Sequence, residues 1–146
     1  MHIEVNCPDG GGNSDIYLRG RYEVQVGTEG GKILTHEMGA IFCQYPPPAG
    51  REIDLERWTT FDITLVGRHV SVLRDGKMYY DNVEIPGPTG GALDSNESEP
   101  GPFYLQGDHH RLSQNNDLCP ARVTMPSLTD DALPSVLSGL LAGFRR

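Results

Sequence analysis

The sequence has few cysteines and no long apolar run, and each shortage excludes a class of protein. The three cysteines, Cys7, Cys43 and Cys119, lie far apart and none forms a CxxC pair, so neither a zinc ribbon nor a redox motif is predicted. We interpret them as ordinary thiols rather than as one disulfide and a spare cysteine. Nothing approaches the roughly 18 apolar residues of a membrane helix, and no basic-then-apolar signal segment opens the chain.

Basic residues are also scarce. Lys and Arg number 12 against 20 Asp and Glu, which gives a net charge of −8, and the largest basic cluster is Arg145-Arg146. An acidic surface repels phosphate backbones and anionic membranes. We therefore predict a soluble chain with neither nucleic acid nor a membrane as partner.

Glycine and proline, in contrast, are abundant, with 18 and 11 residues. A chain of 146 residues is enough for one domain with its own core. Short strands joined by Gly- and Pro-rich turns are typical of an antiparallel sandwich. We predict an all-β fold over residues 1–111 and a C-terminal extension, residues 112–146, with a short helix at 134–144 that has Pro134 in its first turn.

Residues 16–26 (IYLRGRYEVQV) alternate apolar and polar side chains with a period of two, which predicts one strand with a core face and a polar face. Further strands are predicted at Gly39–Gln44, Trp58–Val66, His69–Leu73, Met78–Ile85 and Phe103–Gln106. Asp75-Gly76 between two of them indicates a type I′ hairpin. Residues 86–102 form a loop of a length that is usually functional.

Three groups of residues have the chemistry to act on sugar. The first is the polar row of the first strand, which offers guanidinium, carboxylate and amide groups to hydroxyls and consists of Arg19, Arg21, Glu23 and Gln25. A solvated strand face explains the same pattern equally well.

The second group, Gln106, Asp108, His109 and His110, ends a strand. An acid beside an imidazole can hold a general base or a metal. Only one of two adjacent histidines on a strand can face a given site, and we favour His109. Two surface histidines in a turn are the alternative.

The third group is Glu52, Asp54 and Glu56, which share one face if extended. Glycoside cleavage needs one ionised and one protonated carboxyl group. In a loop the same acids would simply point into solvent.

Four pieces of the chain resemble, in order, the 3-keto-disaccharide hydrolase family. Residues 12–26 (GNSDIYLRGRYEVQV) are similar to its Asn-Ser-Gly-Ile-Tyr-x-Arg-Gly-x-Tyr-Glu-Val-Gln signature. Residues 39–44, 58–63 and 101–109 follow. The resemblance implies a concanavalin- or laminin-G-like jelly roll, action on glycosides, in some members after oxidation at the third carbon of the sugar, and a bacterial periplasmic or secreted location.

The chain departs from that family in three ways. Asp15 stands where the signature has glycine, the usual opening strands are missing, and the closing strand after His109 is replaced. A truncated or frameshifted gene would give such a tail, and we expect the helix or a second copy in a homo-oligomer to cover the exposed edges.

These observations lead to two hypotheses from different classes. In the first, the chain is a glycoside hydrolase in which Glu23 or His109 is the base; the substrate is held by Arg19, Arg21, Gln25, Gln106, Asp108, Tyr17 and Trp58. Glu52–Glu56 also resembles the Glu-x-Asp-x-Glu motif of retaining β-glucanases, where the two glutamates act by double displacement. In the second, the chain is a non-catalytic carbohydrate-binding module with Tyr17, Tyr45 and Trp58 as aromatic platforms. No cofactor is assigned, and a divalent metal stays open.

Overall fold

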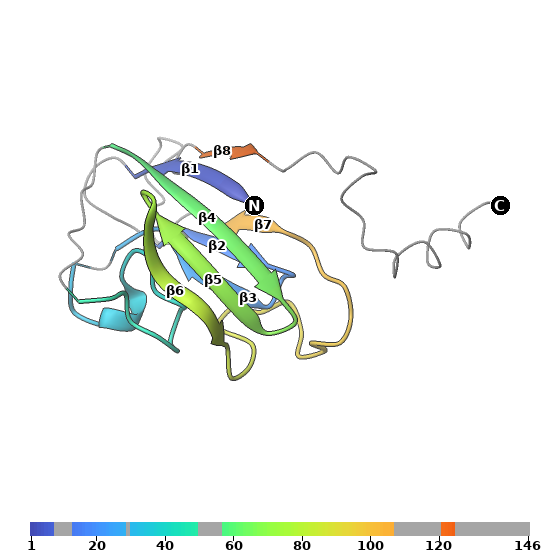
Figure 1. The fold of residues 1–146 in the computed structure, drawn as a ribbon. Coiled ribbons are helices and arrows are strands. Elements are labelled where there is room, and N and C mark those ends of the chain that lie inside the picture. Colours follow the sequence, from blue (N-terminus) through green and yellow to red (C-terminus); the bar gives the residue numbers. More distant parts are fainter. Residues whose placement is uncertain (8–12, 29, 50–56, 107–120, 125–146) are drawn as a thin grey trace, which may run out of the picture.

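The computed structural model describes residues 1–7, 13–28, 30–49, 57–106 and the backbone of 121–124. Two antiparallel sheets form a sandwich (Figure 1), which confirms the predicted all-β fold class. The larger sheet has the order β6-β5-β4-β1-β8 and the smaller one the order β3-β2-β7. The strands are β1 (His2–Asn6), β2 (Asp15–Leu18), β3 (Tyr22–Gln25), β4 (Trp58–Val66), β5 (His69–Arg74), β6 (Lys77–Glu84), β7 (Tyr104–Gln106) and β8 (Ala121–Thr124); a 3₁₀ helix, η2, spans Leu34–His36.

The meander β4-β5-β6 follows the sequence pattern closely. Strand β4 has the predicted bounds, and its buried residues alternate with more exposed ones. Asp75 and Gly76 both have positive φ, of 50° and 70°, as the predicted Asp-Gly turn requires. Local turn chemistry and alternation therefore specify this part of the sheet.

The predicted single strand at residues 16–26 is wrong, because these residues form the hairpin β2-β3. Arg19 and Gly20 have positive φ of 53° and 67°, and the Arg21 N–H donates to the Leu18 carbonyl at 3.1 Å. Leu18 consequently pairs with Tyr22 and Tyr17 pairs with Glu23. Residues two apart on each strand still share a face, so the polar residues of both strands lie on the same side of the sheet.

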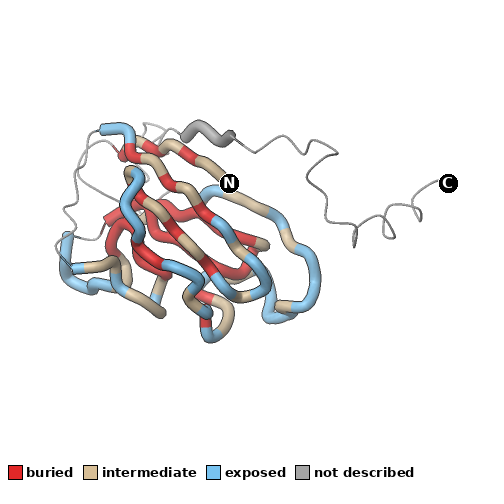
Figure 2. The backbone as a smooth tube through the Cα atoms, viewed as in Figure 1, coloured by how far each residue is buried: buried red, intermediate tan, exposed pale blue. Residues whose placement is uncertain are grey.

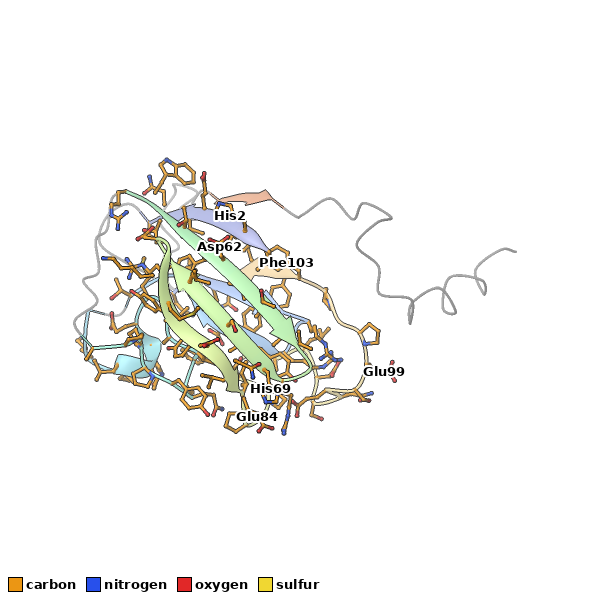
Figure 3. All side chains as sticks on the ribbon, in the orientation of Figure 1. His2, Asp62, His69, Glu84, Glu99 and Phe103 are labelled. Atoms are coloured by element: carbon orange, nitrogen blue, oxygen red, sulfur yellow. The ribbon has the colours of Figure 1, made fainter. Side chains whose placement is uncertain are left out.

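The core lies between the two sheets, where Figure 2 shows the buried residues in red. Ile3, Phe61 and Val70 of the larger sheet and Ile16 and Val24 of the smaller one are each 0% exposed. On the opposite face of the larger sheet, His2 lies beside Asp62 (Figure 3), with Nδ1 and Oδ1 2.6 Å apart.

The strand predicted at Gly39–Gln44 is also wrong. Gly39 and Cys43 have positive φ, of 88° and 57°, which interrupts an extended ladder. The segment makes turns instead, and Ile41 forms isolated bridges to Val24 and Tyr45.

Strands β1 and β8 were not predicted. Strand β1 pairs with both β4 and β8, so an N-terminal strand joins the larger sheet although the opening strands of the family were expected to be missing. The helix expected at 134–144 lies outside the described residues. Within the described part, no helix is long and apolar enough to cross a membrane.

Candidate functional site

The smaller sheet turns a polar face away from the core. Its members stand in two rows across the three strands, Gln25–Asp15–Gln106 and Glu23–Tyr17–Tyr104. Directly opposed side chains on neighbouring antiparallel strands lie about 5 Å apart at Cβ. These six residues, which we call the polar face, therefore form one contiguous patch.

A solvated strand face was one of the two interpretations of these polar residues, but the centre of the polar face is buried. Asp15 and Gln25 are 0% exposed, Tyr17 is 1% exposed and Glu23 is 2% exposed. Alternation correctly separates the core side of β2 and β3 from the polar side. The polar side is buried as well, and over Tyr17 and Tyr104 its cover includes Gly90 and Gly91 of the loop 86–102.

Tyr17 links Glu23 to that loop. Its hydroxyl lies 2.9 Å from Glu23 Oε2 and 2.8 Å from the Gly90 carbonyl oxygen. Its ring stacks on Tyr104 with centroids 4.4 Å apart, and the Tyr104 hydroxyl donates to the Gly91 carbonyl. The two tyrosines thus attach the Gly90–Gly91 segment to the sheet.

The close fit at this segment explains its two glycines. A Cβ on Gly91, whose φ is +70°, would lie 2.3 Å from the Tyr17 hydroxyl oxygen. A Cβ on Gly90 would lie 2.8 Å from Cε1 of Phe42. Any larger residue would push the segment off the polar face.

Burial raises the pKa of Glu23, because a carboxylate is poorly solvated there. Hydrogen bonds with Asp15 and Tyr17, and the nearby His36, act in the opposite direction without cancelling it. Burial and the Glu23 charge also raise the pKa of the Tyr17 hydroxyl, so Tyr17 stays protonated at neutral pH. The face therefore holds a carboxyl group that keeps its proton more readily than an exposed glutamate does.

Arg19 and Arg21 bind the loop. Arg21 is 2% exposed and holds the Asp94 carboxylate with Nε–Oδ1 at 2.7 Å and Nη2–Oδ2 at 3.1 Å. Its Nη1 donates to the Glu99 carbonyl at 3.0 Å, and Arg19 donates to the carbonyls of Glu97 and Glu99. Both arginines thus have intramolecular acceptors, and their predicted role in substrate binding stays a prediction.

The predicted aromatic platforms do not come together. Trp58, 37% exposed, begins β4 in the larger sheet, whereas Tyr17 is buried in the smaller one. Tyr45 donates to the Glu84 carbonyl at 3.0 Å and lies against Tyr80. The described residues therefore give no row of exposed rings on the polar face.

An open pocket of about 390 Å³ lies between the sheets, where Leu18 and Arg19 face Leu65 and Phe103. Figure 3 marks Phe103, which directly precedes β7. None of the polar-face residues lines this pocket, so the two features are separate.

Several predicted site residues lie outside the described residues: Glu52, Asp54, Glu56, Asp108, His109 and His110. Gln106 is the one member of its predicted group that the structure describes, and it ends β7 opposite Asp15. Among the described residues, no three His, Cys, Asp or Glu side chains are grouped as a metal ion would require.

Sequence reasoning missed four residues of this site. Tyr104 joins the polar face because β7 pairs with β2. Gly90 and Gly91 reach the face from a loop that is distant in sequence. His36 comes from η2, and its ring stacks on Phe42. Asp15 had been noted only as a departure from the signature, although its odd number already placed it on the same side as Tyr17.

The fold and the site together define the class of protein: an antiparallel sandwich with a buried acid–phenol cluster on one sheet. Within it, residues 1–116 match the model of the 3-keto-alpha-glucoside-1,2-lyase-like domain, and the chain belongs to that family. The match extends the resemblance seen in the sequence to both β1 and the residues after His109. No curated protein matches the chain.

Two solved structures from Parabacteroides distasonis are similar, and each is described as a candidate glycosyl hydrolase. One is 28% identical with a TM-score of 0.56, over 72% of this chain and 54% of that one. The other is 19% identical with a TM-score of 0.53, over 75% and 70%. The chain thus spans about half the length of the first structure, and the second supports the fold alone. The chain is therefore a member of this family, and its fold is similar to that of two candidate glycosyl hydrolases.

Proposed function

We propose that the chain cleaves the glycosidic bond of 3-keto-α-glucosides by elimination, with Glu23 as the base. The observation that supports this most is a carboxyl group of raised pKa, held by a phenol, at the centre of the polar face. The family description supplies the substrate class. Gln25 and Gln106 flank the centre with amide groups that suit sugar hydroxyls.

The ketone at the third carbon makes the hydrogen on the second carbon acidic. Glu23 takes that proton, and the electron pair of the broken C–H bond forms an enolate. The enolate then forms a carbon–carbon double bond as the bond from the first carbon to the aglycone oxygen breaks, and that oxygen takes up a proton. An unsaturated ketone and a free aglycone are the products, and water can then add across the new carbon–carbon double bond, with its hydroxyl on the first carbon and its hydrogen on the second.

A raised pKa is useful for this step. An ordinary glutamate is a weak base, whereas one with a pKa nearer neutrality accepts a carbon-bound proton with a smaller uphill cost. Substrate entry requires the Gly90–Gly91 segment to lift, because it covers Tyr17 beside Glu23. His109 remains a candidate donor of the proton that the aglycone oxygen receives.

The test compares Glu23→Gln with Glu99→Gln, a matched change on the exposed loop (Figure 3). Aglycone release is measured on 3-keto-α-glucosides, native α-glucosides and β-glucans, with and without divalent metal. Loss of a general base costs about 10²–10⁴ in rate, so Glu23→Gln should lose at least 100-fold and Glu99→Gln almost nothing. Circular dichroism checks that both variants fold.

Other outcomes assign other functions. If β-glucan is cleaved, and Glu52→Gln and Glu56→Gln abolish cleavage while Glu23 is dispensable, the double-displacement mechanism is correct instead. If the chain binds glycan and releases no sugar from any of these substrates, it is a carbohydrate-binding module. Its expected homo-oligomeric state and periplasmic or secreted location stay predictions.

A further inference from the structure

We infer that Asp15 and Glu23 form a coupled carboxyl pair that retains a proton at neutral pH, and that Asp15 is a positioning residue acting through Glu23. The pairing itself is independent of the proposed reaction, and only its catalytic consequence rests on the proposed function. In that reaction, the pair would set the pH at which Glu23 becomes a base.

The sheet register brings the two carboxyl groups together. Asp15 stands opposite Gln25, and Glu23 is the next residue of β3 on the same face, so Asp15 and Glu23 are diagonal neighbours. Diagonal side chains in an antiparallel pair are still within reach of each other. With 0% and 2% exposure, neither group is solvated well enough to tolerate two adjacent negative charges.

The hydrogen count around Tyr17 gives an independent indication. Its oxygen lies within hydrogen-bonding distance of two acceptors, Glu23 Oε2 at 2.9 Å and the Gly90 carbonyl at 2.8 Å. A phenol has one hydrogen and can fully serve only one of them. If Glu23 carries a proton, Glu23 donates to Tyr17 and Tyr17 donates to Gly90, so that the phenol and the carbonyl are both satisfied.

With Glu23 ionised, the arrangement changes. Tyr17 then donates to Glu23, and a proton on Asp15 can donate to the same carboxylate. The Gly90 carbonyl loses its donor in this arrangement. Both arrangements retain a proton on the pair, whereas removing the last proton leaves two buried charges and an unserved carbonyl.

Position 15 is where this chain differs from the signature it resembles, which has glycine there. Asp15 lies in β2 with a negative φ, so the backbone does not require glycine at this position. The second carboxyl group is thus a feature of this chain that a single substitution removes.

Other groups face the pair from every described element around it. The phenols of Tyr17 and Tyr104 come from β2 and β7, and burial and the two carboxylates raise the pKa of Tyr104. His36, at the end of η2, favours the ionised form of Glu23. The amides of Gln25 and Gln106 lie on either side of Asp15 in its row and carry no charge.

The test is a ¹³C NMR titration of side-chain carboxyl groups in the full chain without substrate. It compares the wild type with Asp15→Asn, Asp15→Gly and the exposed control Asp81→Asn. In the wild type, we expect the Asp15 and Glu23 resonances to move together in two steps, the upper one near or above pH 7. In both Asp15 variants, Glu23 should titrate in one step at least about one pH unit lower, because pairs coupled this closely separate by more than that.

The inference is overturned if both wild-type carboxyl groups ionise below pH 5, or if the Glu23 titration is the same with and without Asp15. The wild-type titration decides the first point even if a variant fails to fold. A two-step titration in a protein that cleaves no glycoside would leave the inference intact and reject the proposed function. Catalysis by Glu23 without coupled titration would reject the inference and support the proposed function.

Discussion

Tyr17→Phe is the substitution that most directly tests how the polar face is assembled. It removes one oxygen that lies 2.9 Å from Glu23 Oε2 and 2.8 Å from the Gly90 carbonyl. The ring and its stacking on Tyr104 at 4.4 Å are retained, so little apolar burial is lost.

The expected destabilisation follows from the groups left behind. A buried hydrogen-bonding group left without its partner costs about 1–3 kcal/mol, and the change affects one carboxyl and one carbonyl group. We therefore expect a loss of about 2–4 kcal/mol in the free energy of unfolding. Domains of this kind are stable by only about 5–15 kcal/mol, so the effect is readily measured by urea denaturation.

Tyr104→Phe is the matched control. Its hydroxyl donates to the Gly91 carbonyl over 3.3 Å at an exposed position, so its removal should cost less than about 1 kcal/mol. Equal losses for the two variants would refute the reasoning, because they would mean that the Tyr17 hydroxyl does not link Glu23 to the loop.

Two further predictions concern other parts of the fold. Burial opposes ionisation of Asp75, but hydrogen bonds from the Thr60 N–H and the Arg57 guanidinium outweigh burial and lower the pKa of Asp75. The ionised Asp75 therefore stabilises the fold above the pKa of an unfolded aspartate, about 3.9. This stabilisation is lost as the pH falls through the lower pKa of the folded state. Asp75→Asn keeps a residue that tolerates positive φ, and the variant should lose less unfolding free energy than the wild type between pH 6 and pH 3; an identical pH dependence would contradict the assignment. Gly39→Ala places a Cβ 2.6 Å from Tyr79 Cε1 at a φ of +88°, whereas Gly30→Ala, at a φ of +77°, meets nothing within 4 Å. Thermal unfolding should show a loss of about 1–2 kcal/mol for Gly30→Ala from backbone strain and clearly more for Gly39→Ala, and similar losses would show that Tyr79 moves aside freely.

The sequence predicts those strands whose alternation ends in an unambiguous turn. Asp75-Gly76 lies between β5 and β6, so the end of one strand and the start of the other follow directly. The turn at Arg19-Gly20 escaped prediction for a geometric reason. Leu18 pairs with Tyr22 and Tyr17 pairs with Glu23, so even-numbered residues pair with even-numbered ones and odd with odd. The apolar–polar alternation therefore continues through the turn as if the strand were unbroken.

The burial of the polar face could not be read from the sequence. Alternation shows that Tyr17, Glu23 and Gln25 share one side, but it does not show what lies over that side. The cover includes Gly90 and Gly91, more than sixty residues away along the chain, and its fit depends on the absence of side chains there. Strand β1 was missed because five residues give too short an alternation to stand out.

The central claim is that Glu23 removes the proton from the carbon next to the ketone. The most direct measurement uses a 3-keto-α-glucoside deuterated at its second carbon, with NMR following both aglycone release and the deuterium. The account predicts that the wild type transfers the deuterium to solvent as the aglycone is released, and that Glu23→Gln does neither. Release of aglycone with the deuterium still on the second carbon would contradict it.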